Sequence, residues 1–514
     1  MSTDSSANNK RIAKNTLYLY IRMGIIMLVQ LYTSRIVLNT LGVDDYGIYN
    51  VVGSVVVMFS FISGPLGTAT QRFFNYELGR KNDGKLNLVF NLSLYCYLIL
   101  AIMMFIIIEG GGIWYIENKM NLPESRLNAA MFAFQMSLIS FIFQLIKTPF
   151  ESLIVAHERM SFYAYTSILD VFLKLGNAYS LMWFGIDKLK LYSVNQLIIS
   201  MIIVLTILLY CRKQFVNVRI TKVWDKKVFT SLLSFSGWSL FGSVASMSAN
   251  QGLNLLLNYF YGVAVNAAVG IANQVSAAVN QFVSNFQIAY RPQIVKYYAG
   301  DDYVSLRKLI INTSKYSYLL LFLLSCPIIF NIHFILKVWL GSVPHYAGEF
   351  VILNIIYMLL ETLSAPMWMT VQATGKIRNY QLIISSIILL NIVISYVFLS
   401  LGYSPLIVME VKCILDIAYL SIRLIFIKQK IHLSIRDFFS KVLLHIIPVS
   451  LISIMVLLSI KTLKLSDTQY LLLSSASFYI INVPLILYIC VPKDDRRMLF
   501  QFVKSKMQVT KEWK

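Results

Sequence analysis

Residues 88–108 read LVFNLSLYCYLILAIMMFIII, an apolar run with no charged side chain that is long enough to cross the hydrocarbon core of a bilayer. Similar runs recur along all 514 residues, of which 57% are hydrophobic and only 13% are charged. Soluble domains carry about 25% charged residues. The composition therefore excludes a water-soluble enzyme and predicts an all-α polytopic membrane protein with helices throughout its length.

Fourteen runs approach the length of about 20 residues that a spanning helix needs. The first follows a short basic segment and has no small-residue cleavage site, so we expect it to remain as a helix instead of being removed as a signal peptide. We predict about 14 transmembrane helices, at residues 15–39, 46–66, 88–108, 128–147, 161–184, 191–210, 229–257, 264–290, 309–334, 350–369, 380–401, 405–427, 438–460 and 469–490.

Positive charge is distributed unevenly between the connections. The chain has 45 Lys and Arg against 24 Asp and Glu, a formal net charge of +21. If both termini are cytoplasmic, nearly all of this excess falls on inside segments, above all Arg212 to Lys227 and Lys493 to Lys514, whereas the outside loops carry about equal numbers of both signs. This is the positive-inside pattern of a bacterial inner-membrane protein. Because the cations are spread between spans, they do not indicate nucleic-acid binding.

The chain contains a weak internal repeat. Asn39, Gly42, Gly47, Arg72 and Gly79 mark the first helix pair, and a second pair shows the same order of landmarks at Asn258, Gly262, Gly270, Arg291 and Gly300. Equivalent helices run in the same direction, so we predict two parallel-repeat six-helix lobes related by an axis along the membrane normal, plus two extra C-terminal helices. The expected division is an N-lobe at 1–211, a basic cytoplasmic linker at 212–228, a C-lobe at 229–428, helices 13 and 14 at 429–490, and a basic cytoplasmic tail at 491–514.

Enzymatic motifs are weak or absent in the sequence. Gly79 to Lys85 has the spacing of a Walker A loop, but Leu86 occupies the position of the magnesium-binding Ser or Thr. The five cysteines have no zinc-ligand spacing and suggest no disulfide framework. We therefore expect neither a catalytic site, nor a metal site, nor a cofactor, and we expect any transport to be driven by an ion gradient or by the substrate.

Charged residues inside the predicted helices need a reason, because burying a charge in lipid costs about 2.5–3.5 kcal/mol on the insertion scale. Arg22 lies too deep to reach the surface easily, and Arg35 lies near the opposite end of the same helix. Lys315 and Arg423 lie within a turn or two of the cytoplasmic surface, and we expect them to snorkel.

The acidic residues within the spans are candidates for a coupling-ion site. Asp170 and Lys174 are spaced to pair along one helix face, as are Lys412 and Asp416, although a pair that lines a lumen could also exchange a proton or a sodium ion. Glu361 has no partner nearby in the sequence. We therefore expect Glu361, Asp170, Lys174 or Asp416 to bind a coupling Na⁺ or H⁺.

Two helices carry continuous polar faces. Serine and asparagine side chains recur at steps of three or four residues in 229–257, and amide side chains recur every seven residues in 264–290. Such lines exceed what one interhelical contact requires, so they favour a wet cavity over simple helix packing. The candidate ligand-binding residues on these faces are Asn250, Asn254, Asn273, Asn280 and Gln287.

The segments Leu41 to Tyr49 and Gly67 to Phe74, together with Arg291-Pro292, resemble the Wzx-type polysaccharide (O-antigen repeat-unit) flippases of the multidrug/oligosaccharidyl-lipid/polysaccharide exporter (MOP) superfamily. The resemblance implies an alternating-access transporter that moves undecaprenyl-diphosphate-linked oligosaccharide from the cytoplasmic to the outer leaflet. It also implies that cationic cavity residues receive the diphosphate, and the matching positions are Arg22, Arg35, Arg72 and Arg291.

Other functions remain open at this stage. A cation-coupled drug exporter of the same superfamily would need an acidic or aromatic pocket instead of a basic one. A lipid II flippase would suit fourteen helices, but the characteristic signature of that group in the first two helices is not evident. A glycan polymerase or ligase normally needs a large outside loop, which is lacking; such a polymerase is a candidate partner, along with the lipid-linked oligosaccharide and membrane lipid.

Overall fold

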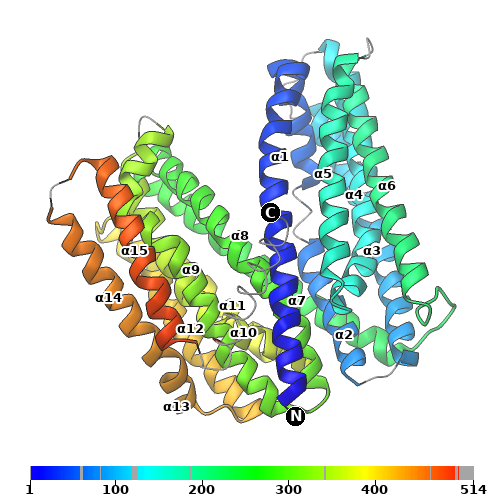
Figure 1. Cartoon of the computed structure of the whole chain (residues 1–514). Coiled ribbons are helices and arrows are strands. Elements are labelled where there is room, and N and C mark those ends of the chain that lie inside the picture. Colours follow the sequence, from blue (N-terminus) through cyan, green and yellow to red (C-terminus); the bar gives the residue numbers. More distant parts are fainter. Residues whose placement is uncertain are drawn as a thin grey trace, which may run out of the picture. The chain divides into compact units, whose positions relative to one another are not determined.

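The computed structural model describes residues 2–57, 62–80, 83–118, 124–183, 187–340, 343–463 and 465–491, together with residues 59 and 496. These residues are almost entirely helical, and no strand occurs among them. The helices are α1 (Ser2–Val57), α2 (Ser63–Gly79), α3 (Asp83–Asn118), α4 (Leu127–Ala156), α5 (Met160–Trp183), α6 (Lys188–Gln214), α7 (Lys226–Tyr261), α8 (Val263–Ala299), α9 (Tyr303–Leu340), α10 (Ala347–Thr374), α11 (Arg378–Ser400), α12 (Ile407–Ile431), α13 (Ile435–Phe438), α14 (Leu444–Lys461) and α15 (Asp467–Ile489) (Figure 1).

The predicted class of fold is confirmed: the protein is an all-α, multi-pass membrane protein. Ten helices among the described residues are long and apolar enough to cross a membrane. The predicted count of fourteen crossings and the cytoplasmic placement of both termini stay predictions. Most of the basic tail at 491–514 lies outside the described residues.

The second predicted helix, at 46–66, includes residues of both α1 and α2. The backbone leaves the helical conformation at Gly42, so the part of α1 that follows, up to Val57, is a separate helical segment, and α2 begins at Ser63. Pro65 lies in the first turn of α2, where a missing backbone N–H costs little. The Ser63-Gly64-Pro65 sequence is thus the signal for this helix start.

The chain forms two compact units. Unit 1 comprises 1–244, 288–302 and 372–383, and unit 2 comprises 245–287, 303–371 and 384–514. The units do not follow the two sequence halves, because the ends of α7, α8, α10 and α11 that we expect to be cytoplasmic belong to unit 1. The division into lobes at 211 and 229 stays a prediction.

Unit 1 is built around α4. This helix packs against α6, α2 and α3, while α1 packs against α5 (Figure 1). The core of the unit includes large aromatic side chains, and Phe90 makes an edge-on contact with Phe150 at 5.2 Å between ring centroids. These contacts fix α2 and the α4–α5 turn, which carry several of the charged residues described below.

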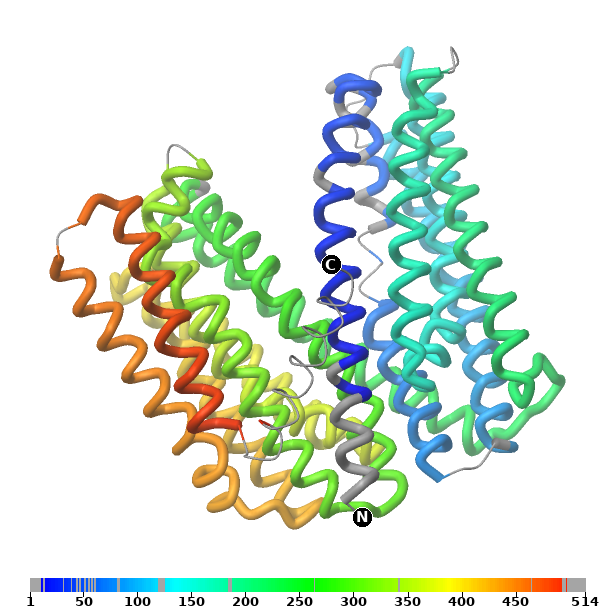
Figure 2. Tube along the Cα trace, viewed as in Figure 1, coloured from blue at the N-terminus to red at the C-terminus, as the bar shows by residue number. Residues whose placement is uncertain are grey.

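Unit 2 has a core formed largely by α8, α9 and α10, with Phe350 fully buried. The hairpin of α14 and α15 packs against α9, and Figure 2 follows the trace from α13 through α14 into α15. Phe478 of α15 lies 5.8 Å from the ring of Phe322 on α9. The two C-terminal helices are therefore an integral part of this unit.

Two glycines adopt the same left-handed backbone at equivalent points of the predicted repeat. Gly42 has φ 79° and interrupts the first helix pair, and Gly262 has φ 76° between α7 and α8. Residues with a Cβ rarely adopt this conformation. The equivalence agrees with the repeat expected from the sequence.

Candidate functional site

Arg72 of α2 is buried, with 8% of its surface exposed. Its Nε and Nη2 donate to the carbonyl oxygen of Ala373 at 3.3 and 2.9 Å, where α10 approaches its end. The guanidinium also lies 4.7 Å from the ring centroid of Phe73 and 4.9 Å from that of Tyr76. Arg72 is thus held by a backbone carbonyl and aromatic rings.

Arg291 of α8 approaches α2, the helix that carries Arg72. Its Nη1 donates to the hydroxyl of Thr68 at 3.3 Å, and its buried Nε has no hydrogen-bond partner. Thr68 lies one helical turn from Arg72, so the structure brings two of the four predicted arginines to neighbouring turns of α2. We call Arg72 and Arg291 the arginine pair.

The other two predicted arginines lie on α1. Arg22 is half-buried, its guanidinium carbon lies 4.7 Å from the ring centroid of Tyr163 on α5, and its Nε has no hydrogen-bond partner. Arg35 is exposed and lies about 20 Å further along the helix. No contact joins these two residues to the arginine pair in the part of the chain that the structure describes.

None of the four arginines lies within ion-pair distance of a carboxylate among the described residues. A buried cation without a counter-charge is costly, since the desolvation of the ion is not compensated. The arrangement in unit 1 therefore suits an anionic ligand that would supply the missing charge, and guanidinium groups match phosphate geometry well.

A buried carboxylate with two cationic partners occupies a nearby part of unit 1. The carboxylate of Glu158, in the turn between α4 and α5, is fully buried and forms ion pairs with Arg11 at 2.8 Å and Lys296 at 2.7 Å. Gln293 donates to the same carboxylate at 2.7 Å. We call these four residues the clasp. They join the start of α1 and the end of α8 to the α4–α5 turn.

The backbone of the clasp is also unusual. Glu158 has φ 58°, a left-handed conformation that costs a non-glycine residue roughly 1 kcal/mol or more. Its N–H donates to the carbonyl of Val155 at 2.9 Å, which closes the α4 end. The sequence analysis missed Glu158, because its partners lie 135 and 138 residues away along the chain.

Two glycines allow α2 and α8 to meet beside the clasp. A Cβ on Gly79 would lie 2.8 Å from the carbonyl oxygen of Lys296 and 2.8 Å from the Cβ of Ala299. A Cβ on Gly300 would contact the carbonyl oxygen of Gly79 at 3.7 Å. These are the landmark glycines that end the two repeated helix pairs, and they now lie against each other.

The opposite end of unit 1 holds another ionic cluster that the sequence analysis missed. Arg126, in a 3₁₀ turn before α4, binds Asp45 of α1 and Asp187, with 2.8 Å from its Nη1 to Asp187 Oδ2. Partial burial pushes the pKa of Asp187 upward, but hydrogen bonds from the Lys190 backbone and from Arg126 outweigh this effect, so that the pKa is lowered. Asp187 also caps α6.

The predicted pair on α5 is formed, with Lys174 Nζ 2.7 Å from Asp170 Oδ2. A second pair, which we did not predict, joins Lys147 and Glu151 along α4 at 3.0 Å. The charges of Lys147, Glu151 and Arg22 all act on the Tyr163 hydroxyl. These charges form a polar interior between α1, α4 and α5 in unit 1.

The predicted amide residues belong to unit 2. Asn250, Asn273 and Asn280 are exposed on their unit, whereas Asn254 and Gln287 are half-buried. The side chain of Asn273 accepts from Asn354 of α10 at 3.4 Å, and the carbonyl of Asn254 accepts from Asn266 at 3.2 Å. The polar faces of α7 and α8 are therefore only partly used in packing.

The α10–α12 region of unit 2 contains a buried carboxylate. Asp416 is 1% exposed, and neither of its oxygens has a hydrogen-bond partner. The expected pairing with Lys412 is wrong, because Lys412 Nζ lies instead 4.3 Å from the ring centroid of Tyr357. Glu361 of α10 is exposed on the unit and acts electrostatically on Asp416.

The expectation that Arg423 and Lys315 snorkel is also wrong. Arg423 is 8% exposed and donates to the hydroxyl of Ser364 across to α10, and Lys315 is 5% exposed. Both helices are packed on the side where these residues lie, so the charged ends stay within the unit instead of reaching its surface.

Long apolar helices in two bundles, with unbalanced arginines in one and an unpartnered carboxylate in the other, define a membrane protein with polar sites among its helices. The fold is similar to that of solved transporters of the MOP superfamily. No protein-family model matches the sequence, and no curated protein matches it.

Three similar structures illustrate this fold, and each covers 83% of this chain and 96% of its own. An outward-facing multidrug resistance MATE family transporter of the MOP superfamily matches with a TM-score of 0.68 at 14% identity. A MATE in complex with MaD3S gives 0.68 at 14%. A MOP superfamily transporter from Pyrococcus furiosus, whose binding pocket of reverse polarity suggests a different function, gives 0.67 at 15%. At these identities the likeness extends to the fold alone.

Proposed function

We propose that the protein is a secondary transporter, not an enzyme, that flips undecaprenyl-diphosphate-linked oligosaccharide repeat units from the cytoplasmic to the outer leaflet. The observation that carries this proposal is the arginine pair, because two guanidinium groups face no carboxylate within ion-pair distance among the described residues. A diphosphate supplies the missing negative charge and accepts hydrogen bonds in the geometry that guanidinium donates.

The membrane potential favours the proposed direction. Moving a negative charge outward across an inside-negative membrane is favourable by about 2.3 kcal/mol per charge per 100 mV. The arginine pair would offset part of the desolvation of the diphosphate. Arg22 and the exposed Arg35 would contact anionic groups at other stages of transport, and the amides Asn250, Asn254, Asn273, Asn280 and Gln287 would bind sugar hydroxyls.

Alternating access requires an end that opens and closes. The clasp and the contact of Gly79 with Lys296 close the end of unit 1 that the charge distribution assigns to the cytoplasm. These contacts would have to break before the lipid-linked oligosaccharide could enter from the cytoplasmic leaflet. We therefore propose that these contacts within unit 1 break and form again during the transport cycle.

Resetting the emptied site is the costly step of this cycle, because its buried cations then lack the anion that compensated them. We propose that a coupling Na⁺ or H⁺ drives it by binding at Asp416, next to Glu361, where two buried carboxylate oxygens have no hydrogen-bond partner. Asp170 is a weaker candidate, since Lys174 already pairs with it at 2.7 Å.

A deletion strain tests the flippase proposal. We expect loss of surface glycan and accumulation of lipid-linked units in the cytoplasmic leaflet, with both restored by the wild-type chain. A normal pool of lipid-linked units in the outer leaflet of the deletion strain would refute the proposal. A glycan polymerase of the same pathway, the partner we propose, should still be present in this strain.

A drug exporter is the second candidate, because the fold is shared with multidrug transporters. The α10–α12 region favours it, since a buried carboxylate suits a cation. Resistance to cationic dyes on overexpression, lost in Asp416→Asn but retained in the arginine-pair variants, would support this alternative over the flippase.

A further inference from the structure

A basic pocket of about 390 Å³ opens in unit 2 between the start of α9 and the helices α13 and α14. It belongs to none of the sites described above. Four cationic side chains and one carboxylate line it, namely Arg307, Lys308, Lys315, Lys441 and Asp437.

The helix geometry explains why these cations converge. Lys308, Asn312 and Lys315 follow at steps of four and three residues, so they lie on one face of α9. Lys315 is 5% exposed and forms the deep part of this wall. Opposite, the π-helical turn Phe439–Leu443 joins α13 to α14 and places Lys441 beside the pocket. Such turns often occur at functional sites.

The pocket keeps an excess of positive charge. Its one lining carboxylate, Asp437, pairs with Lys441 at 3.2 Å, and Arg307 donates to the carbonyl of Ile431 at 3.2 Å. With four cations against this one carboxylate, the lining as a whole carries an excess of positive charge. Basic pockets of this kind between membrane helices on the cytoplasmic side bind acidic lipid headgroups.

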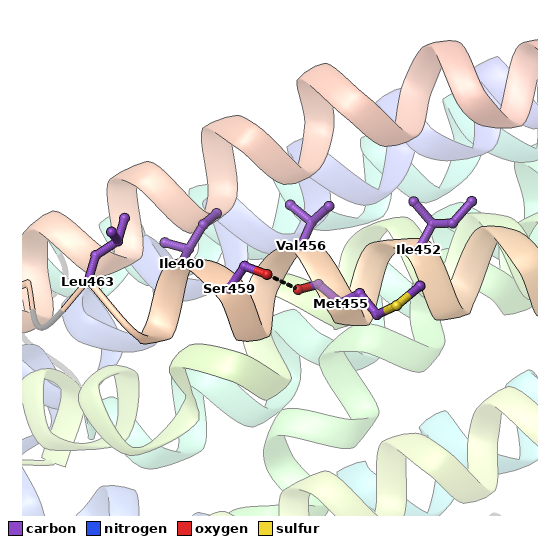
Figure 3. A pocket seen from close by; sticks show the side chains of 6 residues that line it. All are labelled: Ile452, Met455, Val456, Ser459, Ile460 and Leu463. Atoms are coloured by element: carbon purple, nitrogen blue, oxygen red, sulfur yellow. Dashed lines mark hydrogen bonds between the residues drawn. The ribbon is translucent and has the colours of Figure 1, made fainter.

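Apolar residues line a second pocket further along α14. His445, which lines the basic pocket, is followed on the same helix face by Ile452 and Val456 at steps of seven and four, and the turn after the helix adds Leu463. These last three residues belong to this second pocket of about 500 Å³, shown in Figure 3. Ser459 there donates to the Met455 carbonyl at 2.9 Å, so its hydroxyl hydrogen is already used.

We propose that the basic pocket binds the phosphodiester headgroup of an anionic phospholipid of the cytoplasmic leaflet, with an acyl chain along the apolar face of α14. His445 and Val456 are about 16 Å apart along the helix, roughly the depth of one leaflet. A free phosphate ion would use only the basic pocket. The apolar pocket further along the same helix therefore favours the lipid as the ligand.

The test uses the purified full chain, stripped of lipid and incubated with either phosphatidylglycerol or phosphatidylcholine in detergent, with bound lipid counted by native mass spectrometry. We expect selective retention of phosphatidylglycerol. Combining Lys308→Gln with Lys441→Gln should weaken this retention about 30-fold, as expected when two cations near a lipid surface are removed. Val456→Phe should also weaken retention, because the larger ring obstructs the acyl path.

Lys461→Gln is the matched control, since Lys461 lies at the other end of α14 and is exposed, and it should retain phosphatidylglycerol as the wild type does. Elution as a single species in size-exclusion chromatography confirms that each variant is folded. Equal retention of both phospholipids, or unchanged retention in the double lysine variant, would overturn the proposal. Displacement of the lipid by millimolar inorganic phosphate would assign the pocket to free anions instead.

Discussion

Two cations within six residues at the end of α8 differ in their surroundings: Lys296 pairs with a carboxylate, and Arg291 does not. Lys296 and Gln293 both bind the buried carboxylate of Glu158, so each charged group here has a partner of opposite charge or a hydrogen bond. Arg291 donates to the hydroxyl of Thr68 and Arg72 donates to a backbone carbonyl, and neither forms an ion pair with a carboxylate among the described residues. A carboxylate that already has such partners requires no ligand, so it can serve as a structural contact between helices. An uncompensated pair is stabilised by an incoming anion, so it is better suited to bind a ligand.

The largest effect on transport should come from changes to the arginine pair. Arg72→Ala and Arg291→Ala should each lower transport by about 10- to 100-fold, because each removes charge-assisted hydrogen bonds to phosphate. Surface glycan in the complemented deletion strain, at equal protein level, measures this. Arg72→Lys should recover part of the activity, as it keeps the charge.

Arg212→Ala is the matched control, because Arg212 is exposed at the end of α6 and should be dispensable. If Arg212→Ala and Arg291→Ala lowered transport equally, the loss would reflect the removal of any positive charge and not a specific role of the arginine pair.

Asp416 extends the comparison to unit 2, since it is a buried acid without the partners that Glu158 has. Asp416→Asn should reduce transport by roughly tenfold and remove its dependence on the coupling-ion gradient, within the range of typical coupling free energies. Uptake in vesicles with an imposed sodium or proton gradient checks this. Glu410→Gln, an exposed acid on the same helix, should respond to the gradient normally. Full gradient dependence in Asp416→Asn would exclude Asp416 as the coupling residue.

Weakening the clasp should alter the conformation of unit 1 more than it alters substrate binding. Glu158→Gln removes one charge from the clasp but keeps its shape, so it should open this end more often and lower transport only about fivefold or less. A cysteine introduced at exposed Lys14 and labelled from the cytoplasmic side reports the opening. Unchanged labelling together with a loss of transport as large as that of Arg291→Ala would place Glu158 among the ligand-binding residues.

The smallest effect concerns Asp187, at the other end of unit 1. Because its pKa is lowered by folding, its carboxylate stabilises the protein above its ordinary pKa of about 4, and this contribution is lost as the pH falls through the lowered folded value. Asp187→Asn should lower the thermal midpoint by about 1–2 °C at pH 7, since the pair is partly exposed. The difference from the wild type should shrink below about pH 4. A difference that grows on acidification would contradict this account.

Much of the fold follows from residues that are close in sequence. Uncharged runs such as 88–108 predict helices, and Gly42 and Gly262 mark the same helix junction in each repeat. The start of α2 at Ser63 falls inside the predicted helix 46–66, because hydropathy does not respond to the sequence Ser63-Gly64-Pro65. Hydropathy also fails at Arg423, whose burial depends on packing against α10.

The candidate site was only partly predictable. The arginines were found because charge within an apolar run is visible in one sequence, whereas Glu158 occurs in a polar turn, where an acid is unremarkable. Its role depends on Arg11, Gln293 and Lys296, which only the tertiary structure brings to it. The same applies to Asp416, whose sequence neighbour Lys412 turns instead toward Tyr357.

Transfer of a lipid-linked oligosaccharide across a defined bilayer tests the central claim most directly. The purified chain would be reconstituted in vesicles that contain a fluorescent undecaprenyl-diphosphate-linked oligosaccharide in one leaflet, and the fraction that becomes accessible in the other leaflet would be followed with time. The account predicts transfer that depends on the wild-type chain, is strongly reduced in Arg291→Ala and is absent for a neutral polyprenyl-linked sugar. Equal transfer of the neutral lipid, or full activity of Arg291→Ala, would contradict it.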